Sequence, residues 1–323
     1  MKILTRTNIS KPDFYTWYGK MKKLTFILLF FMLSAGLRAQ VEPVQSAYTY
    51  NMAYINPANT GISGMGSFFL WHRSQWYNME GTPQTEMLSF EYPFKKVAFG
   101  LNAFYDKEGP VGRWNATALF SYVIELSLET SLSFGINLGA DQFTYDPSSL
   151  NIKDAGESFL ENNQTYTRIF SGVGATVYSE KWFLGISSPN VLPIRTVASD
   201  ELHAVYHNPR VHFSGGINIP VAYQITMRPA FLLRYAGDLP LNFDTSLLFS
   251  FYDKFNFGFT YRYKAAYILL LSTKITKRFL IGYSFDMDAT DLRRYNYGSH
   301  EVFLKYEFPT PTGKVRFQSP RFF

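Results

Sequence analysis

Large apolar side chains alternate with small or polar ones in many short stretches of the chain. Residues 255–263 read FNFGFTYRY, so five aromatic side chains occupy every second position, with Asn, Gly, Thr and Arg between them. A period of two is that of a β-strand whose two faces meet different surroundings. Taken alone, this stretch does not tell whether its apolar face meets a protein core or lipid.

Fourteen stretches of this kind are expected to form strands. Beyond residue 39 the chain has no sustained helical period and no apolar run long enough for a membrane-spanning helix. The expected strands are residues 65–74, 85–92, 97–106, 112–125, 129–141, 166–179, 182–187, 210–219, 223–235, 241–252, 255–263, 266–275, 278–288 and 299–308. Pro229 removes a backbone donor from one of them, which predicts a bulge or a strand boundary there.

The second face of these strands is rich in Gly, Ser, Asn and full charges, which suits a hydrated or plugged lumen. The expected connections also alternate. The even-numbered ones are tight, and the long ones, residues 75–84, 142–165, 189–208 and 289–298, are all odd-numbered. Because this alternation is typical of outer-membrane barrels, the sequence predicts an all-β fold, a transmembrane antiparallel β-barrel of about 14 strands over residues 65–308.

The positive charge of the chain is concentrated before the barrel. The net charge is +6, and residues 1–39 carry the whole excess, so it does not indicate nucleic acid. Two lysines, an apolar run at 24–33 and small residues ending at Ala39 predict a signal peptide over residues 1–39, with Met21 as the expected start. The protein is therefore expected to be exported to the outer membrane of a Gram-negative bacterium. The chain has no cysteine, which excludes disulfides and thiolate sites.

Motifs for catalysis or cofactor binding are weak, and no catalytic, cofactor or metal site is expected. Gly313 and Lys314 resemble part of a phosphate loop, but Val315 stands where Ser or Thr is needed. His203, His207 and His212 are spread along the chain and are interpreted as solvated loop residues. No glycine-bracketed nucleophilic serine occurs, although a scattered Ser/His pair of an outer-membrane hydrolase stays open.

Charged residues of both signs are expected on the lumen face of the barrel. They are Arg228, Arg234, Asp244, Arg262, Asp286, Glu301, Lys305 and Glu307. They could line a selective pore, or they could pair with one another and hold the lumen together or grip a plug. The mixed signs favour pairing, because paired charges relieve each other's desolvation.

Two segments do not read as ordinary strands. Residues 48–61, YTYNMAYINPANTG, contain turn signals at Asn56–Pro57 and Asn59–Gly61. We interpret residues 40–64 as a turn-rich segment that forms a lumen plug or a periplasmic contact, and residues 309–323 as a C-terminal tail. Residues 72–85 bring Arg73, Gln75 and Trp76 close together, a combination found at interfaces but also at the aromatic girdle of a barrel.

At these segments the chain resembles the PorP/SprF family of outer-membrane proteins of the type IX secretion and gliding system. The resemblance includes YTYNMAYINPANTG, HRSQWYNMEGTPQTEMLSF, FGLNAFYDKEGPVG, FLGISSPNVLP and the late GSHEVFLKYEF. It implies a barrel without catalysis that supports the export or surface anchoring of a cargo with a C-terminal sorting domain. Implied partners are periplasmic ring lipoproteins and a secreted cell-surface adhesin or other cargo.

The segments with family-like motifs hold the candidate partner contacts. These are Asn56, Pro57, Arg73, Gln75, Trp76, His300 and Glu301. A competing hypothesis is a plugged channel for hydrophobic or small solutes, similar to a fatty-acid transporter, in which residues 48–61 would serve as a hatch. The sequence does not identify the cargo.

Overall fold

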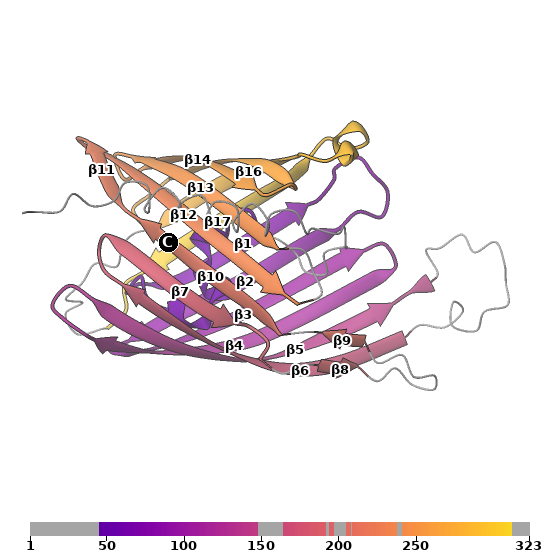
Figure 1. The fold of residues 1–323 in the computed structure, drawn as a ribbon, viewed down its shortest axis with the longest axis horizontal. Helices are drawn as coiled ribbons and strands as arrows, with labels where there is room; N and C mark the ends of the chain where they lie inside the picture. The colour runs from indigo at the N-terminus through magenta and orange to yellow at the C-terminus, as the bar shows by residue number, and fades with distance from the viewer. Residues whose placement is uncertain are drawn as a thin grey trace, which may run out of the picture. The chain divides into compact units, whose positions relative to one another are not determined.

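The chain folds into a closed antiparallel β-barrel (Figure 1). The computed structural model describes residues 45–147, 164–191, 194–196, 205–207, 209–237 and 241–311, and the structural statements below concern these residues. The wall strands are β1 (Gly66–Ser74), β2 (Gln84–Phe94), β3 (Val97–Glu108), β4 (Val111–Glu125), β5 (Ser131–Tyr145), β6 (Gln164–Tyr178), β7 (Trp182–Ser188), β10 (Arg210–Ile217), β11 (Ile219–Ala222), β12 (Ile225–Ala236), β13 (Asn242–Phe251), β14 (Phe255–Arg262), β15 (Ala266–Lys274), β16 (Phe279–Asp288) and β17 (Ser299–Phe308).

Each wall strand pairs with the next strand of the wall, and β17 returns to pair with β1. β11 continues β10 along β12, so the wall has fourteen strands, as the alternation predicted. The short strands β8 (Ile194–Thr196) and β9 (Val205–His207) form a separate pair between β7 and β10. Within the described residues, none of the helices has the length and apolarity needed to cross a membrane.

The bulge or strand boundary predicted at Pro229 is not present in β12, so that prediction is wrong. β12 runs through Pro229 without interruption and keeps its register with β13, where Pro229 lies opposite Leu247. On its other side the wall strand is interrupted at Asn218, between β10 and β11, and the register shifts between Pro220 and Ala222. β12 accommodates Pro229 because the missing N–H removes a single ladder bond and leaves the register with β13 unchanged.

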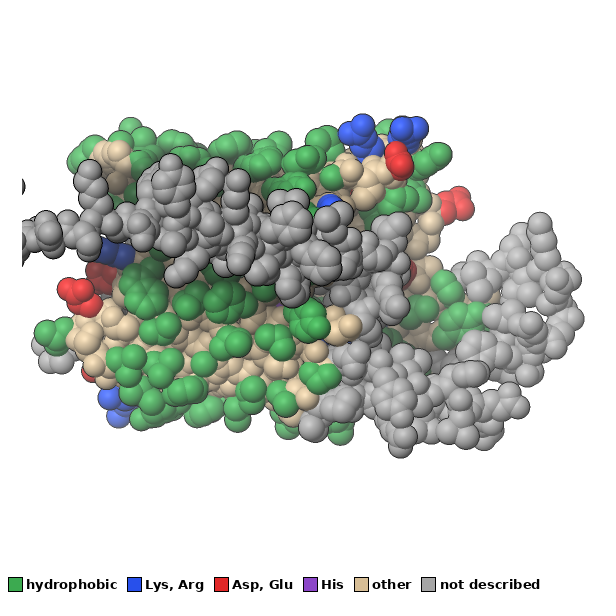
Figure 2. Space-filling model, in the orientation of Figure 1, with side chains coloured by type: hydrophobic (Ala, Val, Ile, Leu, Met, Phe, Trp, Pro, Cys, Tyr) green, Lys and Arg blue, Asp and Glu red, His purple; other side chains and the backbone are tan. Residues whose placement is uncertain are grey.

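The two faces of the wall meet different surroundings, as β14 shows. Phe255, Phe257 and Phe259 point outward and are 42–50% exposed, whereas Arg262 is buried in the lumen. This orientation agrees with the prediction from the sequence. Figure 2 shows hydrophobic side chains covering the middle of the visible barrel face, with charged side chains toward its two ends. An apolar band of this kind is the surface that a barrel presents to lipid.

The two ends of the barrel differ in their connections. The strand ends that lead into the long connections β1–β2, β5–β6, β7–β10 and β16–β17 lie at one end of the barrel, which we call the loop end. Tight connections such as Lys95–Lys96 between β2 and β3 lie at the other end, the turn end. β1 begins at the turn end, where Gly66 is opposite Phe308, and runs toward the loop end.

Candidate functional site

Residues 45–65, which we call the N-terminal segment, occupy the lumen of the barrel. They contain the short helices η1 (Tyr48–Tyr50), α2 (Met52–Ile55) and η2 (Pro57–Asn59), and most of their side chains are buried. In Figure 1 the segment is the indigo stretch seen between the strands of the wall. It contacts β2, β4, β6, β7, β10, β13 and β15 to β17 through hydrogen bonds, so it bridges much of the ring.

The turn at Asn56 and Pro57 packs on a glycine-rich part of the wall. The Asn56 side chain accepts a hydrogen bond from Ala58 N (2.9 Å), as an N-cap does for η2. Its amide nitrogen donates to Thr176 Oγ1 (3.0 Å) and to two strand carbonyls. A Cβ built on Gly135 would lie 2.2 Å from Ala58 N, and one on Gly174 would lie 2.0 Å from Asn56 Oδ1. Glycine is therefore needed at these wall positions for the turn to approach.

Aromatic residues hold the middle of the segment. The hydroxyls of Tyr48 and Tyr50 form hydrogen bonds with Ser246 (3.0 Å) and Ser272 (2.8 Å) on the wall. Tyr50 also packs on the ring of Phe303, with the ring centroids 4.7 Å apart. These contacts hold Tyr50 between β15 and β17.

The start of the segment is held by carboxylates at the loop end. Glu301 accepts hydrogen bonds from the backbone N–H groups of Ser46 (2.8 Å) and Ala47 (3.0 Å) and pairs with Arg73. Asp286 accepts from Ser46 Oγ and forms an ion pair with Arg73 at 2.9 Å. All five residues of this group are buried, so their hydrogen bonds and ion pairs are shielded from solvent. They are Ser46, Ala47, Arg73, Asp286 and Glu301.

These ion pairs continue around the wall. Arg262 lies 3.5 Å from Asp286 and 3.1 Å from Asp244, and Arg234 pairs with Asp244 at 2.8 Å. Three arginines and three carboxylates thus form one connected network on β1, β12, β13, β14, β16 and β17. Because the signs balance, each buried charge has an opposite partner.

A second charged group lies on β4, β5 and β6. Asp141 is fully buried and pairs with Arg113 at 2.9 Å and with Arg168 at 2.7 Å. Asn115 donates to the same carboxylate at 2.8 Å. Both guanidinium groups also lie about 5 Å from the ring of Phe143. A single carboxylate therefore compensates the buried Arg113 and the partly buried Arg168.

The other predicted lumen charges lie nearer the turn end. Arg228 and Asp253 are 3.9 Å apart, and Lys305 and Glu307 are 3.8 Å apart. Lys305 Nζ also donates to the backbone carbonyl of Tyr50 at 3.3 Å. These contacts are longer than those at the loop end, although Lys305 ties the N-terminal segment directly to β17.

The candidate partner contacts fall into two groups. Asn56, Pro57, Arg73 and Glu301 are buried inside the barrel, where the contacts described above engage them. The structure brings Arg73 and Glu301 together as direct cross-strand neighbours of β1 and β17. The role of all four toward a partner protein stays a prediction.

Gln75, Trp76 and His300 lie at the loop end and are partly exposed. Trp76 donates from its backbone to Ser299 Oγ (3.1 Å) and from its indole to Asp288 (3.4 Å). His300 Nδ1 is 2.7 Å from the hydroxyl of Tyr283. Their role as partner contacts likewise stays a prediction.

The interpretation of His212 as a solvated loop residue is wrong. His212 is a buried wall residue on β10, and its Nδ1 lies 3.2 Å from the carbonyl of Ile55. The residue lies within the predicted strand 210–219, and Ile55 of the N-terminal segment contacts it. His203 lies outside the described residues. Across the parts of the chain that the structure describes, no group of three or more His, Asp or Glu side chains could hold a metal ion.

Sequence reasoning missed the apolar part of the lumen. Phe69, Trp71 and Phe303 point inward and pack with Tyr50 and Ala47. The signal was present, because Phe69 and Trp71 share the strand face of Arg73 under a period of two. Gln45 and Ser46 gave no such signal, since no periodic pattern includes them.

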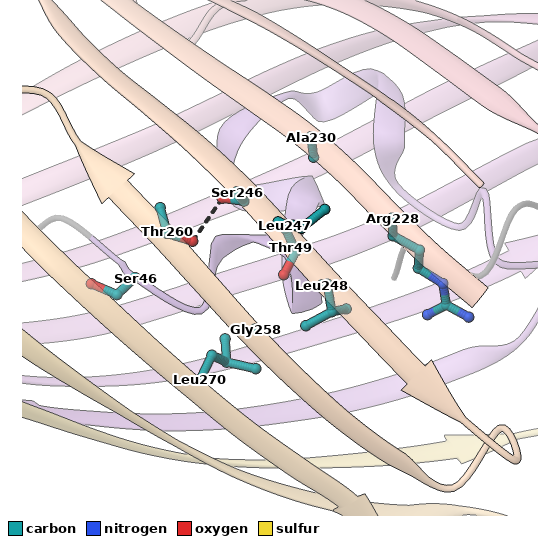
Figure 3. A pocket seen from close by; sticks show the side chains of 10 residues that line it. All are labelled: Ser46, Thr49, Arg228, Ala230, Ser246, Leu247, Leu248, Gly258, Thr260 and Leu270. Carbon is teal, nitrogen blue, oxygen red and sulfur yellow. Dashed lines mark hydrogen bonds between the residues drawn. The ribbon is translucent and has the colours of Figure 1, made fainter. Parts of the chain in front are cut away.

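A small cavity lies between the N-terminal segment and the wall. Figure 3 shows the cavity that Ser46 and Thr49 border from the segment and that β12 to β15 border from the wall. Its volume is about 20 Å³. A cavity of this size has room for about one water molecule.

Several solved structures have a similar fold. The Ralstonia pickettii toluene transporter TbuX has 10% sequence identity and a TM-score of 0.49, with 85% of this chain and 96% of that chain covered. The Acinetobacter baumannii outer membrane protein Omp33 has 10% identity and a TM-score of 0.41, with coverage of 76% and 100%. The KdgM porin has 11% identity and a TM-score of 0.37, with coverage of 75% and 99%. No curated protein matches the chain.

The family comparison covers most of the barrel and the N-terminal segment. The family model described as type IX secretion system membrane protein PorP/SprF matches residues 37–306. This range contains the Asn56–Pro57 turn, both charged networks and nearly all of β17. The chain therefore belongs to the PorP/SprF family of type IX secretion system membrane proteins.

Proposed function

We propose that this protein is a non-enzymatic outer-membrane component of type IX secretion that supports the export or surface anchoring of a cargo protein with a C-terminal sorting domain. Family membership supports a role in the secretion system. The apolar outward faces of strands such as β14 support a position in lipid. The protein would reach the outer membrane after removal of the signal peptide at residues 1–39.

The observation that carries this proposal is the occupied lumen. The N-terminal segment bridges the wall, and the cavity beside it is about 20 Å³. A solute needs a continuous path, whereas a partner protein needs only a stable surface at the ends of the barrel. The filled lumen thus favours a scaffold for other proteins over the competing hypothesis of a solute channel.

Two surfaces are available for such partners. Long connections gather at the loop end, and outer-membrane barrels place their long loops outside the cell and their short turns in the periplasm. In this orientation the loop end, with Gln75, Trp76 and His300, would face the cargo or adhesin. The turn end would face periplasmic ring lipoproteins, and coupling to gliding would pass through them.

Deletion of the gene tests the export role. Cells without the protein should retain or release cargo that wild-type cells attach to their surface, and a plasmid copy of the gene should restore attachment. Affinity purification from native outer membranes should recover ring lipoproteins or a large secreted protein with the barrel. Normal secretion and surface attachment in the deletion strain would remove the export role.

Electrical recording separates the scaffold from the channel. The purified full-length protein should show little conductance in a planar bilayer, because the N-terminal segment fills the lumen. A steady conductance that depends on Arg228, Arg234 or Arg262 would instead support the channel.

A further inference from the structure

The N-terminal segment runs through the lumen from the loop end to the turn end. Ser46 contacts Asp286 and Glu301, which lie close to the loop-end termini of β16 and β17. At the other end of the segment, the N–H of Gly61 donates to Glu91 near the turn end of β2. The segment then joins β1 at the turn end.

The two ends of the segment are therefore held in different ways. The end at Gly61 is covalently continuous with β1, so it stays beside the wall whatever happens to its hydrogen bonds. The end at Ser46 is held to the wall by non-covalent contacts. We call these contacts the latch, which consists of Ser46, Ala47 and the side chains of Arg73, Asp286 and Glu301.

The latch is directly connected to two long loops. Arg73 is followed by the β1–β2 loop, and Glu301 is preceded by the β16–β17 loop. The two loops bind each other, because Tyr77 N donates to Gly298 O (2.8 Å) and Tyr297 N donates to Tyr77 O (3.0 Å). Tyr77 and Tyr297 are also well exposed, with 57% and 68% of their surface accessible. A protein bound to these loops would act on the side chains that hold Ser46.

Buried polar atoms without partners gather at the same place. Both side-chain amide atoms of Gln45, the Nε of Arg73 and the Oδ1 of Asp286 are buried and lack a hydrogen bond in the described structure. A buried polar atom without a hydrogen bond costs free energy, and this cost opposes the closed position. The latch and its neighbour Gln45 carry part of this cost.

We propose that the latch is the releasable end of a plug, and that a partner bound to the β1–β2 and β16–β17 loops controls it. Release would free residues 45–50 toward the loop end while Gly61 stays in place. The partner would be an exported protein that binds from the loop end. This part of the inference rests on the proposed function.

Thiol labelling tests the latch directly, because the chain has no cysteine of its own. Thr49→Cys places a single thiol beside the lumen cavity, where a large, membrane-impermeant maleimide reacts only when the segment moves. In intact cells, adding Glu301→Gln should accelerate labelling by about tenfold or more, since opening is a local equilibrium. The matched control, Glu91→Gln, removes the carboxylate at the covalently held end and should change the rate by less than about twofold.

The loops provide the second part of the test. Gly298 has φ +84°, and a Cβ there would lie 2.6 Å from the Phe285 ring, so Gly298→Ala should disturb the contact between the two loops and accelerate labelling. Gly81→Ala has similar backbone strain at φ +71°, but its Cβ would make only an ordinary contact of 3.7 Å with Gly109 Cα, and it serves as the control. Asp286→Asn repeats the latch test if Glu301→Gln fails to give the heat-modifiable barrel band on gels.

Each outcome decides the proposal. Equal labelling rates for the Glu301 and Glu91 variants would overturn the latch, and equal rates for the Gly298 and Gly81 variants would overturn the control by the loops. These measurements need no cargo, so their failure is separate from failure of the export role in the deletion strain.

Discussion

Replacement of Gly135 by alanine should displace the N-terminal segment while leaving the barrel intact. The new Cβ would lie 2.2 Å from both Ala58 N and the carbonyl carbon of Pro57, where an ordinary contact needs at least 3.4 Å. The turn or the wall must therefore move by about 1.2 Å. Overpacking of this kind costs about 1–3 kcal/mol. Because the clashing atoms belong to the segment, the cost falls on its docking.

Conductance in planar bilayers measures this displacement. A cost of about 1.4 kcal/mol raises the population of the displaced state about tenfold, so Gly135→Ala should give transient openings far more often than the wild type. Gly258→Ala is the matched control, because its Cβ would meet the Leu248 side chain at 2.8 Å and no atom of the segment. This control changes the packing of the wall alone and should stay closed.

Two results would refute the reasoning. If Gly135→Ala and Gly258→Ala open equally often, the openings come from the wall and the turn does not seal the lumen. If the free energy of unfolding of Gly135→Ala in urea falls by as much as the free energy of opening calculated from the opening frequency, β5 absorbs the clash instead of the segment.

Three further changes test the wall and the turn. Phe257→Arg, on the lipid face, should lower the free energy of unfolding by about 2–4 kcal/mol, and Phe255→Arg near the turn end by only about 0–1 kcal/mol. If the Phe257→Arg variant has the same urea midpoint as the wild type, β14 is inside out. Asp141→Asn should cost about 3–5 kcal/mol because it removes the carboxylate that pairs with the buried Arg113 and the partly buried Arg168, and adding Arg168→Gln should recover part of this loss in a double-mutant cycle. Asn56→Ala should weaken docking of the segment by about 1–3 kcal/mol, seen as more frequent openings with an unchanged urea midpoint; a change in the midpoint alone would contradict this.

The sequence predicted the wall well because a strand in a barrel has only two faces. Alternation placed Phe257 outside and Arg262 inside, and the exposure of these residues agrees with it. Closure of the barrel brings together residues that alternation alone does not pair. In a closed barrel the first and last strands are neighbours, so Arg73 near the end of β1 lies opposite Glu301 near the start of β17. This ion pair requires both the closure and the register.

The path of the N-terminal segment could not be predicted in this way. Its turns at Asn56 and Asn59 were evident from local sequence, but their position in the lumen depends on packing against strands more than a hundred residues away. Asn56 bonds to Thr176, and His212 contacts Ile55. Such contacts leave no periodic signal, so the sequence alone does not predict that His212 is buried.

The segment also explains the composition of the lumen face, which alternation alone leaves unexplained. About eight strands make a barrel that its own side chains can fill, and fourteen leave a wider interior. Where the turn at Pro57 approaches the wall, the lumen face carries Gly135 and Gly174, and on the opposite side Phe303 extends inward to reach Tyr50. The wall therefore has no side chain where the backbone of the turn approaches it and a large ring where it packs on Tyr50. A wall shaped to one occupant in this way is expected of a barrel that is closed at rest, and it is the reason that single changes at wall glycines should open it.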